Sequence, residues 1–170
     1  MKMHDVLASP GAVHSVPVER LGRHDSLGVL LHEAQLIDLR MDALTRRAGL
    51  IFDLRVALEI RDANTGVLVI DDVERLSWAG VGPTEPLIAW SVDGAALERG
   101  LGSITISLGL WPAPGGELTI VGTAGVFVAG NVPHLADVPP DYTETDRPGL
   151  EGLIADWESE FTPFTASVLA

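Results

Sequence analysis

The sequence predicts a mainly β protein, either a β-sandwich or a partly open barrel, that contains an antiparallel meander and one C-terminal amphipathic helix. Every even position from residue 50 to residue 60 is apolar, and four of the six odd positions from 51 to 61 are charged, which predicts a long strand with one buried face. Several shorter apolar runs are separated by glycine- and proline-rich turns, which is typical of sandwiches and barrels. Helical spacing of apolar residues over residues 150–161 predicts the helix. An α+β fold is the alternative.

The strand over residues 50–61 is expected to form a hairpin with residues 67–78, because Asp62, Asn64 and Gly66 supply turn chemistry between them. Apolar periodicity shifts by one position in the second arm, so we expect a bulge or bend near Val73. Even positions of the first arm should face the core and odd positions should face water. The even positions include Phe52, Leu54, Val56 and Leu58, and the odd positions include Asp53, Arg55, Glu59 and Arg61.

Flanking segments complete the predicted sheet. An upstream strand over residues 37–42 should pair with residues 50–61, which gives a three-strand meander. A proline- and glycine-rich loop is expected over residues 111–116. Further strands are expected at residues 87–92, 103–110, 118–121 and 125–129.

The C-terminal helix is expected over residues 150–161, after a surface loop over residues 137–148 that contains three prolines. Its apolar stripe should pack on the sheet with Trp157 as a core anchor. Its members are Leu150, Leu153, Ile154, Trp157 and Phe161.

No repeat or long polar linker divides the chain, so residues 1–170 are expected to form a single domain. Residues 1–17 have weak periodicity and are expected to be disordered or to wrap the surface. No apolar signal-peptide region precedes a cleavage site, and residues 101–136 alternate as strands do rather than forming a membrane helix. We therefore expect a cytoplasmic protein that does not enter the membrane.

Composition excludes several classes of function. The chain has no cysteine, which removes disulfides, thiolate catalysis and cysteine zinc sites. Its net charge of −13 comes from 24 acids and 11 bases, so it is not expected to bind nucleic acid. Such a charge favours solubility or a basic partner.

Motifs for catalysis, cofactors or metals are weak, and no cofactor or metal is predicted. His32 begins a sequence like the zinc-protease signature, but the residue four positions later is leucine. No serine lies in the G-x-S-x-G pattern of hydrolases. Asp71, Asp72 and Glu74 are the densest carboxylates. Because neighbours on a strand point to opposite faces, a solvated bend explains Asp71 and Asp72 better than an acid–base pair does.

Candidate binding residues lie at one tryptophan and in the C-terminal part of the chain. Trp111 stands beside the proline-glycine loop, where its burial is not assured, so it is a candidate contact residue. Residues 137–160 contain eight acids and one base, close to half of the net charge. The candidate partner-binding residues are Asp141, Tyr142, Glu144, Asp146 and Trp111.

Residues 31–40, read Leu-His-Glu-Ala-Gln-Leu-Ile-Asp-Leu-Arg, lead through a connector into the strand at residues 50–61. This opening resembles that of small bacterial β-rich immunity proteins of polymorphic toxin systems and related domains of unknown function. The resemblance implies a protein that binds a toxin, and it assigns no functional residue.

Three classes of function follow. The first is an immunity- or antitoxin-like binding module that docks a basic protein, such as a nuclease toxin, through an acidic C-terminal face. The second is a carrier that holds a small ligand inside a sandwich or barrel and needs an enclosed cavity. The third is an enzyme that uses carboxylates, which needs titratable groups clustered in such a cavity. The sequence leaves the oligomeric state open.

Overall fold

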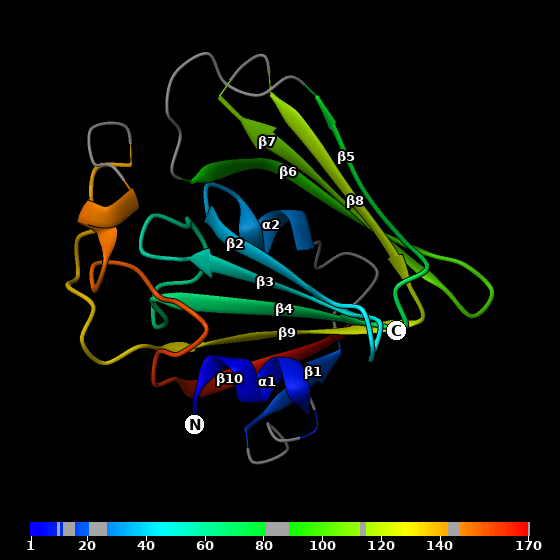
Figure 1. Ribbon diagram of the computed structural model, residues 1–170, viewed down its shortest axis with the longest axis horizontal. Coiled ribbons are helices and arrows are strands. Elements are labelled where there is room, and N and C mark those ends of the chain that lie inside the picture. The colour runs from blue at the N-terminus through cyan, green and yellow to red at the C-terminus, as the bar shows by residue number, and fades with distance from the viewer. Residues whose placement is uncertain are drawn as a thin grey trace.

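The structure, a computed structural model, describes residues 1–9, 11, 16–20, 27–80, 89–112, 115–142 and 147–169. Within them, ten strands form one sheet in the order β1-β10-β9-β4-β3-β2-β6-β7-β8-β5 (Figure 1). β1 pairs with β10 in parallel, and the other neighbours in this order are antiparallel. The strands are β1 (Val18–Arg20), β2 (Gln35–Asp42), β3 (Arg47–Asp53), β4 (Thr65–Asp71), β5 (Arg75–Gly80), β6 (Trp90–Arg99), β7 (Ile104–Trp111), β8 (Gly116–Gly122), β9 (Ala124–Asn131) and β10 (Thr162–Leu169).

The sheet folds into a six-strand half, from β1 to β2 in the sheet order, and a four-strand half made of β5, β6, β7 and β8. In Figure 1 the connections from β4 to β5 and from β8 to β9 lie at the right, and β2 and β6 begin side by side at the upper left. They join between β2 and β6 through two residue pairs, Gln35 with Ser91 and Leu36 with Trp90. The chain also connects the two halves directly at two places, where β4 of the six-strand half leads into β5 and where β8 of the four-strand half leads into β9. The path through neighbouring and continuous strands from β2 to β6, β7, β8, β9, β4 and β3 therefore leads back to β2, and we call this path the ring.

A sharp corner lets these two long strands belong to both halves. Asp72 adopts a left-handed conformation with φ 47° between β4 and β5, which confirms the bend predicted near Val73. On the neighbouring strand, a Cβ on Gly122 would lie 2.5 Å from the carbonyl oxygen of Asp71. The strands can approach this closely because glycine has no side chain.

The inside of the ring is filled by one apolar core. It takes side chains from both halves, including Leu50, Phe52, Ile106 and Leu118, all without solvent exposure. Helix α2 (Leu27–Leu31) packs on β6 and adds its first and last leucines to this core.

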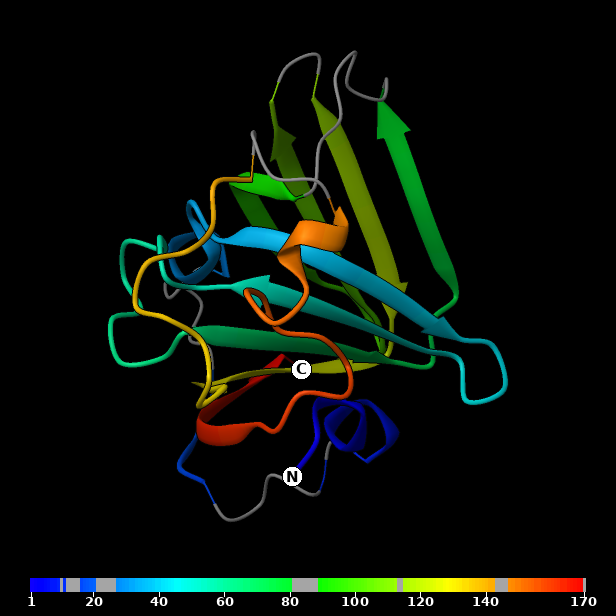
Figure 2. The same cartoon turned by 60° about the vertical axis from the view of Figure 1, so that its left-hand side comes forward.

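A second core covers the outer face of the six-strand half. It contains outward-facing residues of β3, β4 and β9, such as Ile51 and Val67. Helix α1 (Met3–Ala8) and the irregular segment after β9 lie over this face (Figure 2). Because both faces of these strands are buried, the half-exposed hairpin arm predicted from residues 50–61 is wrong.

Other sequence predictions have mixed outcomes. The meander is confirmed as β2, β3 and β4, and β7, β8 and β9 lie where strands were predicted. The first arm ends at Asp53, however, and Val56 and Leu58 are 36% and 44% exposed. The end of the second arm forms β5 and pairs with β8 in the other half of the sheet.

The predicted helix over residues 150–161 is wrong. A 3-10 helix spans Arg147–Leu150, turns follow it, and the chain then enters β10. Gly152 has φ 76°, a left-handed conformation that does not continue an α-helix. Leu150, Trp157 and Phe161 are still buried, because irregular backbone directs them inward. Leu153, also predicted to belong to the buried stripe, is 46% exposed, so the stripe is only partly buried.

Candidate functional site

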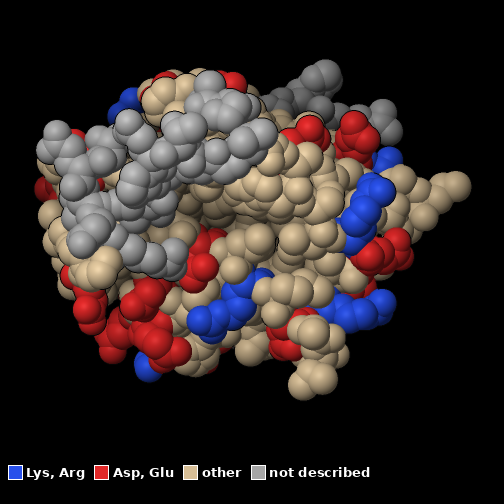
Figure 3. Space-filling view, turned by 45° about the horizontal axis from the view of Figure 1, so that its top comes forward, with Lys and Arg blue, Asp and Glu red and all other residues tan. Residues whose placement is uncertain are grey.

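The best candidate site is the acidic segment, defined as residues 132–142 and 147–161, which crosses the outer face of the six-strand half. Some of its apolar residues point inward, and Val132, Leu150 and Ala155 are buried, whereas Val138 and Leu153 are exposed. Its acids point to solvent, and acidic side chains gather at the lower left of Figure 3. The exposed acids are Asp137, Asp141, Glu151, Asp156, Glu158 and Glu160.

Arg55 holds the acidic segment at two places. Its Nη1 donates to the carbonyl of Ala136 at 2.9 Å, and its Nη2 donates to the carbonyl of Leu153 at 2.9 Å. The same guanidinium forms an ion pair with Asp53, at 2.6 Å from Nη2 to Oδ2, and both side chains are at least 97% buried. Burial opposes the charge of Arg55, but the hydrogen bond and charge of Asp53 outweigh it and raise its pKa.

Tyr142 adds a third attachment. Its hydroxyl donates a hydrogen bond to Oδ2 of Asp53. Burial, followed by the negative charge of Asp53, raises the pKa of Tyr142 well above its ordinary value. The hydroxyl therefore stays protonated and works as a donor.

Trp157 anchors the end of the segment. Its ring is 2% exposed, and its Nε1 donates to Oδ2 of Asp38 at 2.9 Å. The guanidinium carbon of Arg40 lies 5.1 Å from the ring centroid, within range of a cation–π contact. This core-anchor role was predicted, although the predicted helix is absent.

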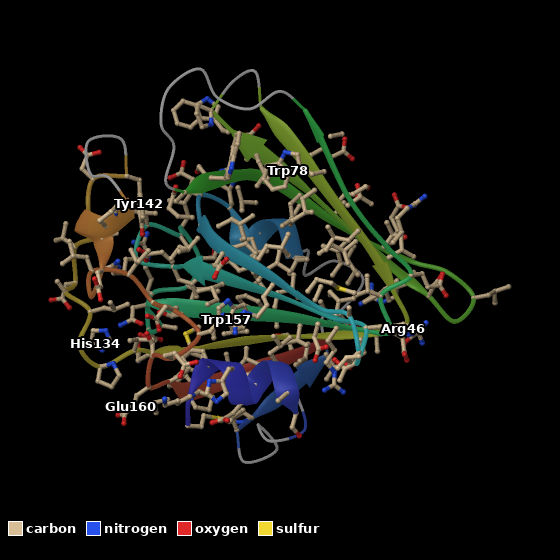
Figure 4. All side chains as sticks on the ribbon, in the orientation of Figure 1. Arg46, Trp78, His134, Tyr142, Trp157 and Glu160 are labelled. Carbon is tan, nitrogen blue, oxygen red and sulfur yellow. The ribbon has the colours of Figure 1, made fainter. Side chains whose placement is uncertain are left out.

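A hollow of about 470 Å³ opens beside this anchor. Asp156, Glu158 and Glu160 line it together with His134. Figure 4 shows His134 and Glu160 at the same end of the molecule. Its size and charge suit a lysine or arginine side chain of another molecule.

The N-terminal residues border the hollow and neutralise part of its charge. Lys2 Nζ pairs with Glu158 at 2.9 Å, and His4 lies 3.3 Å from the same carboxylate. The hydrogen bond and charge of Lys2 lower the pKa of Glu158, and those of Glu158 raise the pKa of Lys2. Asp156 accepts hydrogen bonds from the backbone of Glu158 and the hydroxyl of Ser159, which fixes its carboxylate.

The structure does not bring the predicted partner-binding residues together as one surface. Asp141 is exposed, but Tyr142 is tied to Asp53 and is not available as an aromatic anchor. Trp111 is 58% exposed and ends β7 in the four-strand half, so it belongs to another part of the sheet. Glu144 and Asp146 lie outside the described residues.

Asp53 and Arg55 were missed as site residues because strand alternation assigned both to water. The strand ends at Asp53, where alternation no longer applies. Oδ1 of Asp53 then accepts from the backbone of Arg55, two residues later, and folds the arginine back over the carboxylate. An Asp-x-Arg pattern at the end of an apolar run was the available signal.

The carboxylates at residues 71–74 are part of the corner. Arg47 pairs with Asp71, and Arg46 pairs with Asp72 at 2.7 Å. Among the described residues, no group of three or more His, Asp or Glu side chains is placed to hold a metal ion. The described helices have four to six residues, too few to cross a bilayer.

Searches of protein-family models, curated proteins and solved structures find no match to this chain.

Proposed function

We propose that the protein is a protein-binding module and that its acidic segment docks a basic protein partner. The observation that carries this proposal is the combination of six exposed acids with a backbone held in place by the hydrogen bonds of Arg55 and by the buried Trp157. A charged surface that is already ordered does not have to pay for ordering its backbone on binding.

The negative charge of the acidic segment supports a role in the first approach of the partner. The protein carries a net charge of −13, and six exposed acids lie in the acidic segment. Such a field speeds the approach of a positively charged partner more than it tightens the final complex. The hollow beside Trp157 would accept one basic side chain of that partner.

The resemblance to immunity proteins of toxin systems adds a partner class to the proposal. A nuclease toxin is basic because it must approach phosphates, so an acidic surface of this kind complements it. Among the described residues, the inside of the ring is packed with side chains and the hollows open at the surface, which favours binding at the surface.

The test is partner capture with two matched variants. The acidic-segment variant carries Asp137→Asn, Glu151→Gln and Glu160→Gln. A control with the same charge change carries Glu59→Gln, Asp93→Asn and Glu98→Gln, all exposed and outside the acidic segment. A basic protein captured by the wild type and the control, but lost with the acidic-segment variant, is the expected result.

Association kinetics with the captured protein then test the mechanism. At low salt, the acidic-segment variant should associate about tenfold more slowly than the control, and added salt should remove most of the difference. An association rate that responds neither to these substitutions nor to salt would show that the acids serve solubility alone.

A further inference from the structure

Strand β5 is an open edge of the sheet. It pairs with β8 from Arg75 to Gly80 without a register shift, and it ends the strand order. Figures 1 and 2 both show β5 at the margin of the four-strand half. Within the described residues no strand pairs with its other side, so a row of backbone N–H and C=O groups faces outward.

The usual protections of an edge strand are absent from β5. Proteins block such edges with lysine, proline, a bulge, inward-pointing charges or a very short strand. β5 has six residues and no lysine, proline or bulge, and its one charged residue, Arg75, lies at its start. The opposite edge, β1, has three residues and is protected by its short length.

We propose that β5 pairs with β5 of a second copy of this chain, antiparallel across a twofold axis, and extends the sheet through both molecules. Such β-strand addition supplies backbone hydrogen bonds, and side chains opposite one another set the register. This inference does not rest on the proposed binding of a basic partner.

Side-chain direction limits the register. Residues opposite each other in an antiparallel pair point to the same face of the sheet, whereas neighbours along one strand point to opposite faces. The twofold axis must therefore pass through a residue of β5 and not between two residues. Centred on Ser77, the pairing places Leu76 against Trp78 of the second copy, an aliphatic–aromatic pair on the inner face. A pairing centred on Trp78 would place the two Trp78 indoles opposite each other. Each indole already makes an edge contact with Trp90 of its own chain, with 5.5 Å between ring centroids, so this register would be crowded. The smaller Ser77 therefore lies at the axis.

Charge permits the pairing although each chain carries −13. Residues 76–80 of β5 are uncharged. With Ser77 at the axis, Arg75 lies opposite Ala79 of the second copy, so no like charges meet. The remaining repulsion between the two chains is long-range and is screened by salt.

Disulfide trapping tests the register directly, because the chain has no cysteine of its own. Ser77→Cys places two thiols opposite each other, with Cα atoms about 4.5 to 5.5 Å apart, which suits a disulfide. Thr119→Cys is the matched control, since Thr119 lies beside Ser77 on β8. Its copies would be about 14 Å apart across three strand spacings, too far to bond. Under mild oxidation, only the Ser77→Cys protein should form a covalent dimer.

Sedimentation equilibrium tests the unmodified interface. The wild type should dimerise with rising concentration, and salt should strengthen the dimer. Ser77→Lys should weaken it about tenfold or more by placing two ammonium groups at the axis, whereas Thr119→Lys should not. A protein that is monomeric up to about 1 mM overturns the proposal, even if the edge accepts a strand of another protein. Equal disulfide formation by both cysteine variants also overturns it, because random collision would then explain the product.

Discussion

The protein has a single tyrosine, and that residue closes the buried Asp53–Arg55 network. Ionisation of Tyr142 is therefore visible in the near-ultraviolet absorbance of tyrosinate without interference from other tyrosines. Burial and the charge of Asp53 raise the pKa of Tyr142 in the folded state. We predict that the native protein shows no tyrosinate absorbance between about pH 10 and 11.5, while the unfolded chain titrates near its ordinary value of about 10.

The same shift predicts how stability depends on pH. Above about pH 10 the unfolded chain loses the tyrosine proton and the folded protein keeps it, so the folded state binds more protons. The free energy of unfolding must then fall as pH rises, by at most about 1.4 kcal/mol per pH unit. Near pH 11.5 this loss reaches about 2 kcal/mol relative to pH 9.

Tyr142→Phe supplies the control. At neutral pH this variant should be less stable than the wild type by about 1 to 3 kcal/mol, because Asp53 loses a donor in a buried site. Since phenylalanine does not titrate, the difference between the two proteins should nearly vanish by about pH 11.5. Urea unfolding at a series of pH values measures both curves. A native tyrosine that titrates near pH 10, or a difference that stays constant with pH, would refute the assigned contact.

Two further predictions concern packing. Trp157→Ala should lower the free energy of unfolding by about 3 to 5 kcal/mol, whereas Trp111→Ala, at a 58% exposed position, should change it by no more than about 0.5 kcal/mol in the same denaturant experiment. Gly122→Ala should lower the free energy of unfolding by about 1 to 3 kcal/mol, because the added Cβ would meet backbone atoms at the corner. Gly94→Ala is the control, since a Cβ there meets open space, and it should be neutral or slightly stabilising in thermal unfolding. Equal melting temperatures for the two glycine variants would contradict the close approach at the corner.

Much of the sheet could be predicted because its strands leave a period of two in the sequence. Leu50, Phe52 and Leu54 alternate along β3 and just beyond it, and all three enter the inner core. The second core could not be inferred from this pattern, since Ile51 and Val67 are covered by segments from both ends of the chain. Such coverage depends on contacts between distant residues, which local periodicity does not record.

The candidate site was only partly predictable for a related reason. Acidic residues of the C-terminal part were expected at the surface, and charge alone was enough for that. Apolar spacing could not distinguish a helix from irregular chain, because Leu150 and Trp157 are both buried although turns and irregular chain separate them. Tyr142 was interpreted as a contact residue because its partner Asp53 lies 89 residues away in the chain.

The corner at Asp72 and Gly122 also bears on how the protein folds. Each bent strand contributes to both halves of the sheet: β4 pairs with β9 in one half, and their continuations β5 and β8 pair in the other. The strands that meet there come from distant parts of the chain. Near the far end of the same pair, the backbone N–H of Asn64 donates a hydrogen bond to Oδ1 of Asn131, 67 residues away in the chain. Closing such a long loop before its contacts form is entropically costly and slows folding. We therefore expect the pairing of these two distant stretches of chain to form more slowly than the hairpins between neighbouring strands.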